Sequence, residues 1–167
     1  MFSADDVTWF LDTADRLGID VWLDGGWGVD ALVGRQTRPH HDLDIILSTP
    51  HGAELVAELE AQGFVEIELE SRRSFNFVFG HPDGRKIDFH QFDRNPAGDG
   101  VYGSAGPVFT SEALSGNGSV AGRRVRCIDP ATVVRFHTGY AHDADDVHDV
   151  LLLCSTFGIE IPEQYRS

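Results

Sequence analysis

The chain has 167 residues, of which 41% are hydrophobic, so it can form a folded core and disorder is not expected. Its formal net charge of −14 argues against binding a nucleic-acid backbone, which requires clustered Lys and Arg. No apolar run is long enough to span a bilayer and no signal region follows Met1, so we expect a cytoplasmic protein with no membrane contact. The same charge would suit a cationic substrate or bound divalent ions, or it serves solubility alone.

The first half of the chain predicts alternating helices and strands. Ser3 is a typical N-cap, and Gly18 and Gly63 are typical helix ends. The predicted elements are a helix over 4–17, a strand that turns sharply over 21–26, a short helix over 27–34, a strand over 43–48 and a helix over 49–62.

The second half predicts strands and then helices. Residues 64–70 alternate, with Val65, Ile67 and Leu69 on one face and glutamates on the other. The remaining predictions are a hairpin over 74–92, a loop with one short strand pair over 93–124, a helix opened by Asp129 and Pro130, and a last helix around 147–154. Together they indicate an α+β fold with a mixed sheet: residues 1–125 form the core, and 126–167 form a helical extension of the same compact unit.

Three aspartates indicate a metal site. Asp42 and Asp44 are two residues apart on a predicted strand and therefore project from one face. Asp88 and His90 share a face of the hairpin by the same parity. If the two strands are neighbours, the three carboxylates converge, and such a set can hold two divalent ions, as in phosphoryl or nucleotidyl transfer. Alternatively, the carboxylates lie in water at a rim.

The Gly25–Gly26 pair lies between a predicted strand and a predicted helix. Two glycines there allow the backbone to approach a ligand closely, and the first turn of the helix offers free N–H groups to a phosphate. Glycines at this position also commonly do no more than form the turn.

Four segments carry a family resemblance: W-L-D-G-G-W-G-V-D-A-L-V-G, T-R-P-H-H-D-L-D-I, K-I-D-F-H-Q-F and F-H-T-G-Y. They resemble the nucleotidyltransferase superfamily of DNA polymerase beta, and within it the antibiotic-modifying branch. The lincosamide nucleotidyltransferases are the closer match and the aminoglycoside 2″-adenylyltransferases the second. The resemblance extends from about Trp9 to Leu153 and implies a nucleotidyltransferase-like sheet flanked by helices.

The resemblance implies a role for each acidic residue and for the glycine pair. Asp42, Asp44 and Asp88 would bind Mg²⁺, with two ions expected and Mn²⁺ as an alternative. Asp88 would be the third ligand or the base that deprotonates the acceptor hydroxyl. Gly25 and Gly26 would cradle the triphosphate.

Further residues are assigned to the nucleotide, each with a structural alternative. The wider superfamily commonly has a Ser after the glycine pair, where this chain has Trp27. Backbone N–H groups or Arg38 must therefore supply the phosphate contact. Trp27 stacks on the nucleotide or packs in the core, Arg38 binds phosphate or is solvated, and His40 fits the motif spacing of the family.

The acceptor is assigned three residues. His90 orients Asp88, touches the acceptor or is structural. His137 and Tyr140, three apart on a predicted helix, line the substrate pocket or belong to the core. Asp146 and Asp149 either form a cluster of negative charge at the start of a helix or contact an amine of the substrate.

The predicted function is transfer of a nucleoside monophosphate from a nucleoside triphosphate to a hydroxyl of a small-molecule antibiotic, which confers resistance. A lincosamide is the first acceptor and an aminoglycoside the second. The alternatives are a nucleotidyltransferase toxin that acts on RNA or protein, which the acidic charge disfavours, and a catalytically silent nucleotide-binding module. A metal-dependent glycosyltransferase normally needs a longer chain. The resemblance also implies a possible homodimer.

Overall fold

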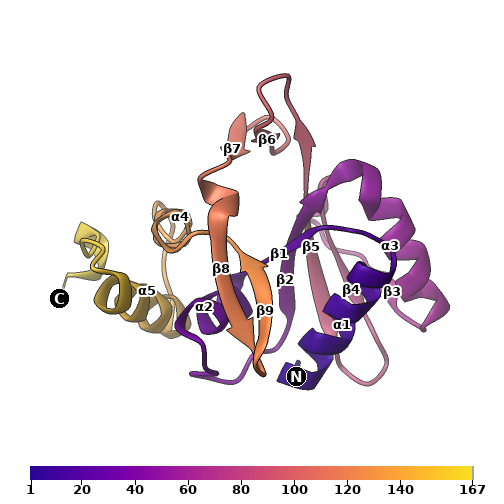
Figure 1. Cartoon of the computed structure of the whole chain (residues 1–167), viewed down its shortest axis with the longest axis horizontal. Coiled ribbons are helices and arrows are strands. Elements are labelled where there is room, and N and C mark those ends of the chain that lie inside the picture. The colour runs from indigo at the N-terminus through magenta and orange to yellow at the C-terminus, as the bar shows by residue number, and fades with distance from the viewer. Residues whose placement is uncertain (167) are drawn as a thin grey trace.

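The computed structural model describes residues 1–166 (Figure 1). The helices are α1 (Ala4–Arg16), α2 (Gly25–Val33), α3 (Thr49–Ala61), α4 (Pro130–Phe136) and α5 (Ala144–Phe157), with 3-10 turns at Ala113–Ser115 and Glu163–Tyr165. The strands are β1 (Val21–Asp24), β2 (Leu43–Ser48), β3 (Val65–Ile67), β4 (Asn76–Gly80), β5 (Lys86–Arg94), β6 (Gly100–Val101), β7 (Pro107–Phe109), β8 (Gly116–Val120) and β9 (Arg123–Cys127). Ser167, the last residue of the predicted helical extension, lies outside the described residues.

The strands form one mixed sheet in the order β3-β4-β5-β2-β1-β9-β8. Strand β2 is parallel to β5 and antiparallel to β1, and β6 and β7 extend from the end of β5. This confirms the predicted α+β class with a mixed sheet. No helix among residues 1–166 is both long and apolar enough to cross a membrane.

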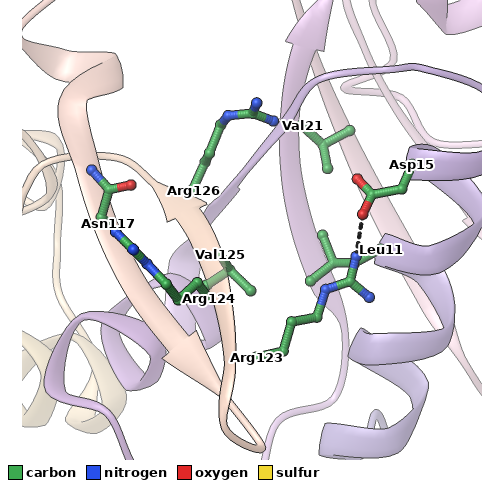
Figure 2. A pocket seen from close by; sticks show the side chains of 8 residues that line it. All are labelled: Leu11, Asp15, Val21, Asn117, Arg123, Arg124, Val125 and Arg126. Atoms are coloured by element: carbon green, nitrogen blue, oxygen red, sulfur yellow. Dashed lines mark hydrogen bonds and ion pairs between the residues drawn. The ribbon is translucent and has the colours of Figure 1, made fainter.

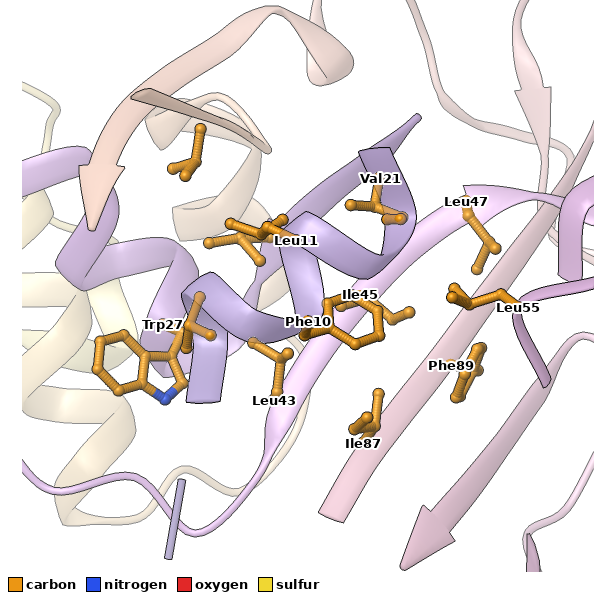
Figure 3. Close-up of a cluster of buried hydrophobic side chains, with 14 of the residues drawn as sticks. Phe10, Leu11, Val21, Trp27, Leu43, Ile45, Leu47, Leu55, Ile87 and Phe89 are labelled. Carbon is orange, nitrogen blue, oxygen red and sulfur yellow. The ribbon is translucent and has the colours of Figure 1, made fainter. Parts of the chain in front are cut away.

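Side chains of β2 point alternately to the two faces of the sheet and so contribute to two hydrophobic cores. Leu43, Ile45 and Leu47 lie in the core that includes residues of α1 and α3 (Figure 3). Ile46 faces the opposite side and packs in a second core with Val133 of α4 and Val150 of α5. The C-terminal helices α4 and α5 therefore pack on the sheet through this second core.

Two of the strand predictions need correction. The segment 64–70 is a strand only over β3, and Val65 and Leu69 are exposed, not buried on a common face. The reason is its place at the sheet edge, where β3 pairs with β4 alone. The segment 93–124, predicted as loop with one short strand pair, contains β6, β7 and β8, and β8 completes the sheet beside β9.

The helix predicted from Asp129 is shorter than expected. It ends at Phe136, His137 is its C-cap, and Tyr140 lies in the connection to α5. His137 and Tyr140 therefore do not share a helix face, and the prediction based on their spacing is wrong. The connection ends at Asp143, whose carboxylate accepts the N–H groups of Asp145 and Asp146 and caps α5.

Candidate active site

The register of three adjacent strands brings the acidic residues together. Asp44 of β2 lies opposite Asp88 in the parallel β2–β5 pair and opposite Asp24 in the antiparallel β1–β2 pair. Directly opposed residues project from the same face of a sheet, so these carboxylates form a row across β1, β2 and β5. The predicted convergence of Asp44 and Asp88 is therefore present in the fold.

Asp44, Asp88 and His90 form a compact acid cluster. Each offers one ligand atom, and these atoms lie within 4.8 Å of one another. Nε2 of His90 is 3.9 Å from Oδ1 of Asp44 and 3.8 Å from Oδ1 of Asp88. Asp42 lies just before β2, is exposed, and is outside this 4.8 Å group. It is still close enough for its charge to act on Asp88.

Carboxylates this close perturb one another's ionisation. Burial, together with the charges of Asp44 and Asp42, raises the pKa of Asp88 to about 6, although His90 opposes the shift. Burial also raises the pKa of Asp24, and the Asp44 charge adds to this. Burial acts to lower the pKa of His90, but the neighbouring carboxylates outweigh it and raise that pKa. Burial and mutual repulsion therefore both oppose full ionisation of the carboxylates in the cluster.

The glycine pair is adjacent to this cluster. Gly25 has φ +54°, and a Cβ added there would overlap the carboxylate of Asp44. A Cβ on Gly26 would overlap the His40 ring and the Arg38 guanidinium. No side chain caps the first turn of α2, so its N–H groups remain available to an anion. Gly25 is therefore required for the close approach of the backbone to Asp44, and Gly26 for its close approach to His40 and Arg38.

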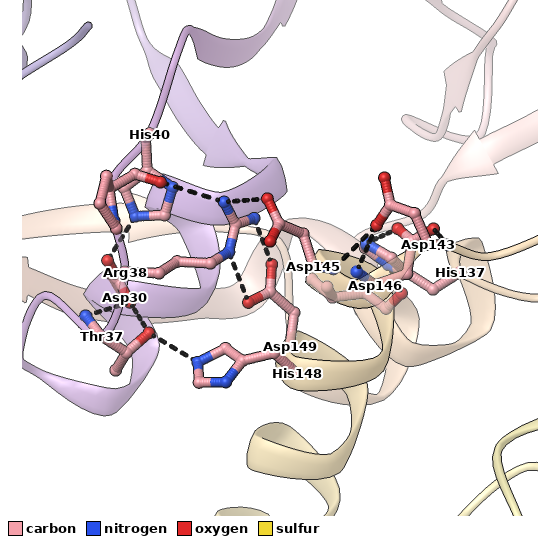
Figure 4. A network of polar contacts seen from close by, with 12 residues as sticks. Asp30, Thr37, Arg38, His40, His137, Asp143, Asp145, Asp146, His148 and Asp149 are labelled. Atoms are coloured by element: carbon pink, nitrogen blue, oxygen red, sulfur yellow. Dashed lines mark hydrogen bonds and ion pairs between the residues drawn. The ribbon is translucent and has the colours of Figure 1, made fainter.

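Arg38 joins the core of the protein to α5 (Figure 4). Its Nε and Nη2 donate to the two carboxylate oxygens of Asp149 at 3.1 and 2.7 Å, and Nη1 lies 3.0 Å from Oδ2 of Asp145. Asp149 is buried, so this bidentate pair is shielded from solvent. Burial acts to lower the pKa of Arg38, and its aspartate partners raise it. Much of the donor capacity of Arg38 is therefore already engaged within the protein.

His40 and Trp27 lie behind the glycine pair. His40 is 3% exposed and bonds through Nε2 to Asp30, which in turn accepts from Thr37. The ring of Trp27 lies 4.7 Å from that of His40 and is 2% exposed. Trp27 therefore packs in the core, and its ring is too little exposed for the predicted stacking on a nucleotide.

The other predicted acceptor residues meet at the start of α5. Tyr140 donates a hydrogen bond to Oδ1 of Asp146 at 3.0 Å, and Nε2 of His137 is 3.6 Å from the same oxygen. His137, but not Tyr140, lines a cavity of 260 Å³ that we call the acidic pocket. Its other lining residues come from both halves of the chain: Gly25, Gly26, Arg38, His40, His41, Asp42, Asp44, Asp143, Asp145, Asp146 and Asp149.

Three residues at the site were not predicted to act there. Asp24 could have been suggested by its place directly before the glycine pair. Asn76 of β4 donates to Oδ1 of Asp88 at 2.9 Å, and Tyr102 lies 2.8 Å from Nδ1 of His90. The sequence gives no signal for Tyr102, because the segment that carries it has no periodic pattern.

A second cavity, of 330 Å³, lies between α1 and the β8–β9 hairpin (Figure 2). We call it the arginine groove, since Arg123, Arg124 and Arg126 line it. The other lining residues are Leu11, Asp15, Val21, Asn117 and Val125. It shares no residue with the acidic pocket.

The donor set of the acid cluster fits a divalent cation. Carboxylate oxygens are the ligands that Mg²⁺ and Mn²⁺ prefer, and among residues 1–166 no Lys or Arg forms an ion pair with Asp44 or Asp88. A cation at this place would offset both the burial and the neighbouring negative charges that raise the pKa of Asp88.

A strand, a glycine turn, a helix and facing carboxylates on two parallel strands are the arrangement that the resemblance to the nucleotidyltransferases implies. The chain belongs to the aminoglycoside-2''-adenylyltransferase family, whose sequence model matches residues 6–153.

Named relatives agree with this assignment. A lincosamide resistance protein of Staphylococcus haemolyticus is 31% identical over 147 residues, covering 85% of this chain and 88% of the relative. A 2''-aminoglycoside nucleotidyltransferase of Klebsiella pneumoniae is 29% identical over 167 residues, covering 94% and 89%. Among solved structures, lincomycin-bound lincosamide adenylyltransferase LnuA matches with a TM-score of 0.80 at 26% identity, covering 92% of this chain and 98% of that one.

Proposed function

We propose that this nucleotidyltransferase moves a nucleoside monophosphate from a nucleoside triphosphate to a hydroxyl of an amine-bearing antibiotic, a lincosamide first and an aminoglycoside second. The observation that carries the proposal is the parallel register of Asp44 with Asp88 beside the Gly25 turn. This arrangement puts carboxylates, free N–H groups and a cavity at one place, as transfer from a charged triphosphate requires.

Residues at different places in the site have different roles in the proposed reaction. Asp88 accepts the proton of the acceptor hydroxyl from its place opposite Asp44 in the β2–β5 pair. The N–H groups of Gly25, Gly26 and the residue that follows them bind phosphate oxygens. His40 and Asp30 hold the turn in place from behind.

Asp44 and Asp88, with Asp42 nearby, would hold Mg²⁺, or Mn²⁺ in its place, and two ions are expected. When bound, such ions offset phosphate charge and favour the departure of pyrophosphate. His90 adjoins the two carboxylates and orients Asp88.

The acidic pocket supports a cationic acceptor. Six aspartates line it, at positions 42, 44, 143, 145, 146 and 149, and Arg38 is the arginine among the lining residues. An amine on the acceptor would gain from the field of these carboxylates. Asp146, held by Tyr140 and close to His137, lies on the α5 side of the pocket, away from the acid cluster on the sheet. We assign His137 and Asp146 to the acceptor side.

Product mass tests the proposal. The protein is incubated with Mg²⁺, with ATP, GTP, CTP or UTP, and with a lincosamide, an aminoglycoside or tRNA. We expect one nucleoside monophosphate to be added to a lincosamide, with pyrophosphate released in equal amount. Modification of tRNA in place of any drug would contradict the proposal and favour a toxin.

Asp88→Asn tests the role of the Asp88 carboxylate with little change in side-chain size. It keeps the size of the side chain and the bond from Asn76, but it removes the base and a carboxylate ligand. We expect turnover to fall by at least about 100-fold with the thermal midpoint maintained. Unchanged turnover would dismiss Asp88 from catalysis.

Two further predictions accompany the assay. Pairing of two chains, which the family resemblance implies, stays a prediction and is read from sedimentation of the same preparation. We also place the reaction in the cytoplasm, because it consumes a nucleoside triphosphate.

A further inference from the structure

The connection from α4 to α5, residues 137–143, carries the acceptor side of the acidic pocket. His137 and Asp143 line the pocket directly. The connection also holds both carboxylate oxygens of Asp146: Oδ1 accepts from the hydroxyl of Tyr140 at 3.0 Å, and Oδ2 accepts from the N–H of Asp143 at 3.0 Å. Figure 4 shows His137, Asp143 and Asp146 together at the start of α5. The path of the connection therefore sets where the two residues assigned to the acceptor lie.

The connection has few backbone hydrogen bonds of its own. Within residues 1–166, Gly139 is the one residue of 139–142 whose backbone N–H makes a hydrogen bond. That bond goes to Oε1 of Gln164 at 3.2 Å. Gly139 has φ +91°, so the chain leaves the helical path of α4 there. A segment with so few bonds takes its position from the side chains that contact it.

The 3-10 turn after α5, which we call the 163–165 turn, supplies those side chains. The hydroxyl of Tyr165 donates to the carbonyl oxygen of His137 at 2.5 Å, and Nε2 of Gln164 donates to the same oxygen at 3.2 Å. Because Oε1 of Gln164 accepts from the N–H of Gly139, this one amide joins two points of the connection.

Tyr165 is itself held in place by packing. It is 6% exposed and belongs to the second core, which also includes Leu153 of α5. Its ring lies 4.6 Å from the ring of His142, which is a further contact with the connection. The bond from its hydroxyl therefore ties the backbone of His137 to the core beneath α5.

We propose that Gln164 and Tyr165 are positioning residues for the acceptor: they hold the 137–143 connection so that His137 and Asp146 are presented to the acidic pocket. Neither Gln164 nor Tyr165 is among the residues that line the pocket, so each acts through the connection and not by contact with a substrate. The effect on catalysis rests on the proposed function, whereas the hold on the connection depends only on contacts within the protein.

Amide exchange of Gly139, measured by NMR of ¹⁵N-labelled protein, tests the hold on the connection without any substrate. Gln164→Ala removes the oxygen that this N–H bonds, and we expect exchange to become about fivefold faster. Arg166→Gln is the control, because the side chain of Arg166 bonds Ile161 and Glu160 within its own segment. It should leave the exchange rate unchanged. An unchanged rate in Gln164→Ala, or an equal rise in the control, would overturn the proposal.

Tyr165→Phe tests the positioning of His137. It keeps the buried ring and removes only the hydroxyl that bonds the His137 carbonyl oxygen. We expect the ring resonances of His137, assigned with His137→Gln, to shift in Tyr165→Phe and to stay in place in Arg166→Gln. Unmoved resonances in Tyr165→Phe would contradict its role.

The transfer assay then separates positioning of the acceptor from a general structural role. With the antibiotic that gives product, we expect Tyr165→Phe to raise the KM for that antibiotic about fivefold. The kcat and the KM for the nucleotide should stay within about twofold, because the affected contacts are remote from the reacting groups and weaken ground state and transition state alike. Arg166→Gln should keep all three constants at the wild-type values. Equal rises in both KM values would show a merely structural role and contradict the proposal.

Failure of the proposed function and failure of this inference give different results. If wild-type protein forms no product with any drug but Gly139 and His137 respond as expected, the acceptor role falls with the proposed function and the hold on the connection stands. If product forms and the KM for the antibiotic is unchanged in Tyr165→Phe, the inference fails and the proposed function stands.

Discussion

The acidic pocket and the arginine groove are both charged cavities, but they differ in how their charges are paired. In the groove, Arg123 bonds Asp12 and Asp15, and Arg126 lies 2.9 Å from Asp20, so two of the three arginines have anionic partners. In the pocket, Arg38 is the one arginine among the lining residues, and it pairs with two of the six lining aspartates, Asp145 and Asp149. Paired charges satisfy one another on the surface, whereas a surplus of one sign creates a field that a ligand of the other sign can relieve.

The difference arises from the backbone. In the groove, the arginines are on β9 and their partners on and just after α1, at the surface, where long side chains find partners freely. Asp44 lines the pocket; strand register fixes it opposite Asp88, and Gly25 leaves room for its carboxylate. Repulsion that is imposed by the fold, and not avoided by it, is typical of a functional site.

The largest expected effect is that of Asp44→Asn on turnover. The exchange removes a ligand charge from the acid cluster, and we expect initial rates of nucleotidyl transfer to fall about 10³-fold, which corresponds to about 4 kcal/mol. The thermal midpoint should change little, since the side chain is partly exposed and its size is kept. Asp15→Asn, the groove counterpart, should leave the rates at the wild-type value; a similar loss there would erase the distinction between the two cavities.

Arg38→Gln should produce the next largest effect, on stability. The exchange leaves Asp149, whose side chain is 3% exposed, without its bidentate partner. We expect the free energy of unfolding in urea to fall by about 3 kcal/mol, because a buried carboxylate loses its counter-charge. Arg123→Gln breaks exposed ion pairs of the groove and should cost about 1 kcal/mol or less. Equal losses would mean that burial does not distinguish the two networks.

A smaller effect is expected from pH in protein free of metal. The pKa of Asp88 is about 6 in the folded chain, above its ordinary value of 3.8, so the folded state holds this proton more tightly. Its contribution to stability is complete below pH 3.8 and is lost as pH rises through 6. After allowance for its partial exposure we expect about 2 kcal/mol. Urea unfolding at a series of pH values measures it; Asp88→Asn should abolish this component, and persistence in the variant would refute the assignment.

Arg124→Ala should have the smallest effect. Within the part of the chain that the structure describes, no ion pair or hydrogen bond of its side chain is found, and it is exposed on β9. We expect a change of less than about 0.5 kcal/mol in unfolding free energy and unaltered transfer rates. A marked loss of activity would show that the arginine groove takes part in the reaction after all.

Strand parity and helical spacing in the sequence predicted some side-chain positions correctly and others wrongly. Parity along β2 and β5 correctly placed Asp44 and Asp88 on the faces that meet, because a strand has only two faces and the opposite residues are apolar. The same parity failed for Val65 and Leu69, since alternation does not tell whether any element covers a strand at the sheet edge. Helical spacing failed for His137 and Tyr140, because the helix ended at Phe136 before reaching them.

By itself, the sequence determined the class of the fold, the glycine turn and the two acid-bearing strands, since each depends on residues a few positions apart. Only the tertiary structure decided which distant groups meet there: Asp149 with Arg38, and Tyr102 with His90. Those contacts join segments of chain whose separation is set by sheet order and helix packing, and no local periodicity encodes that order.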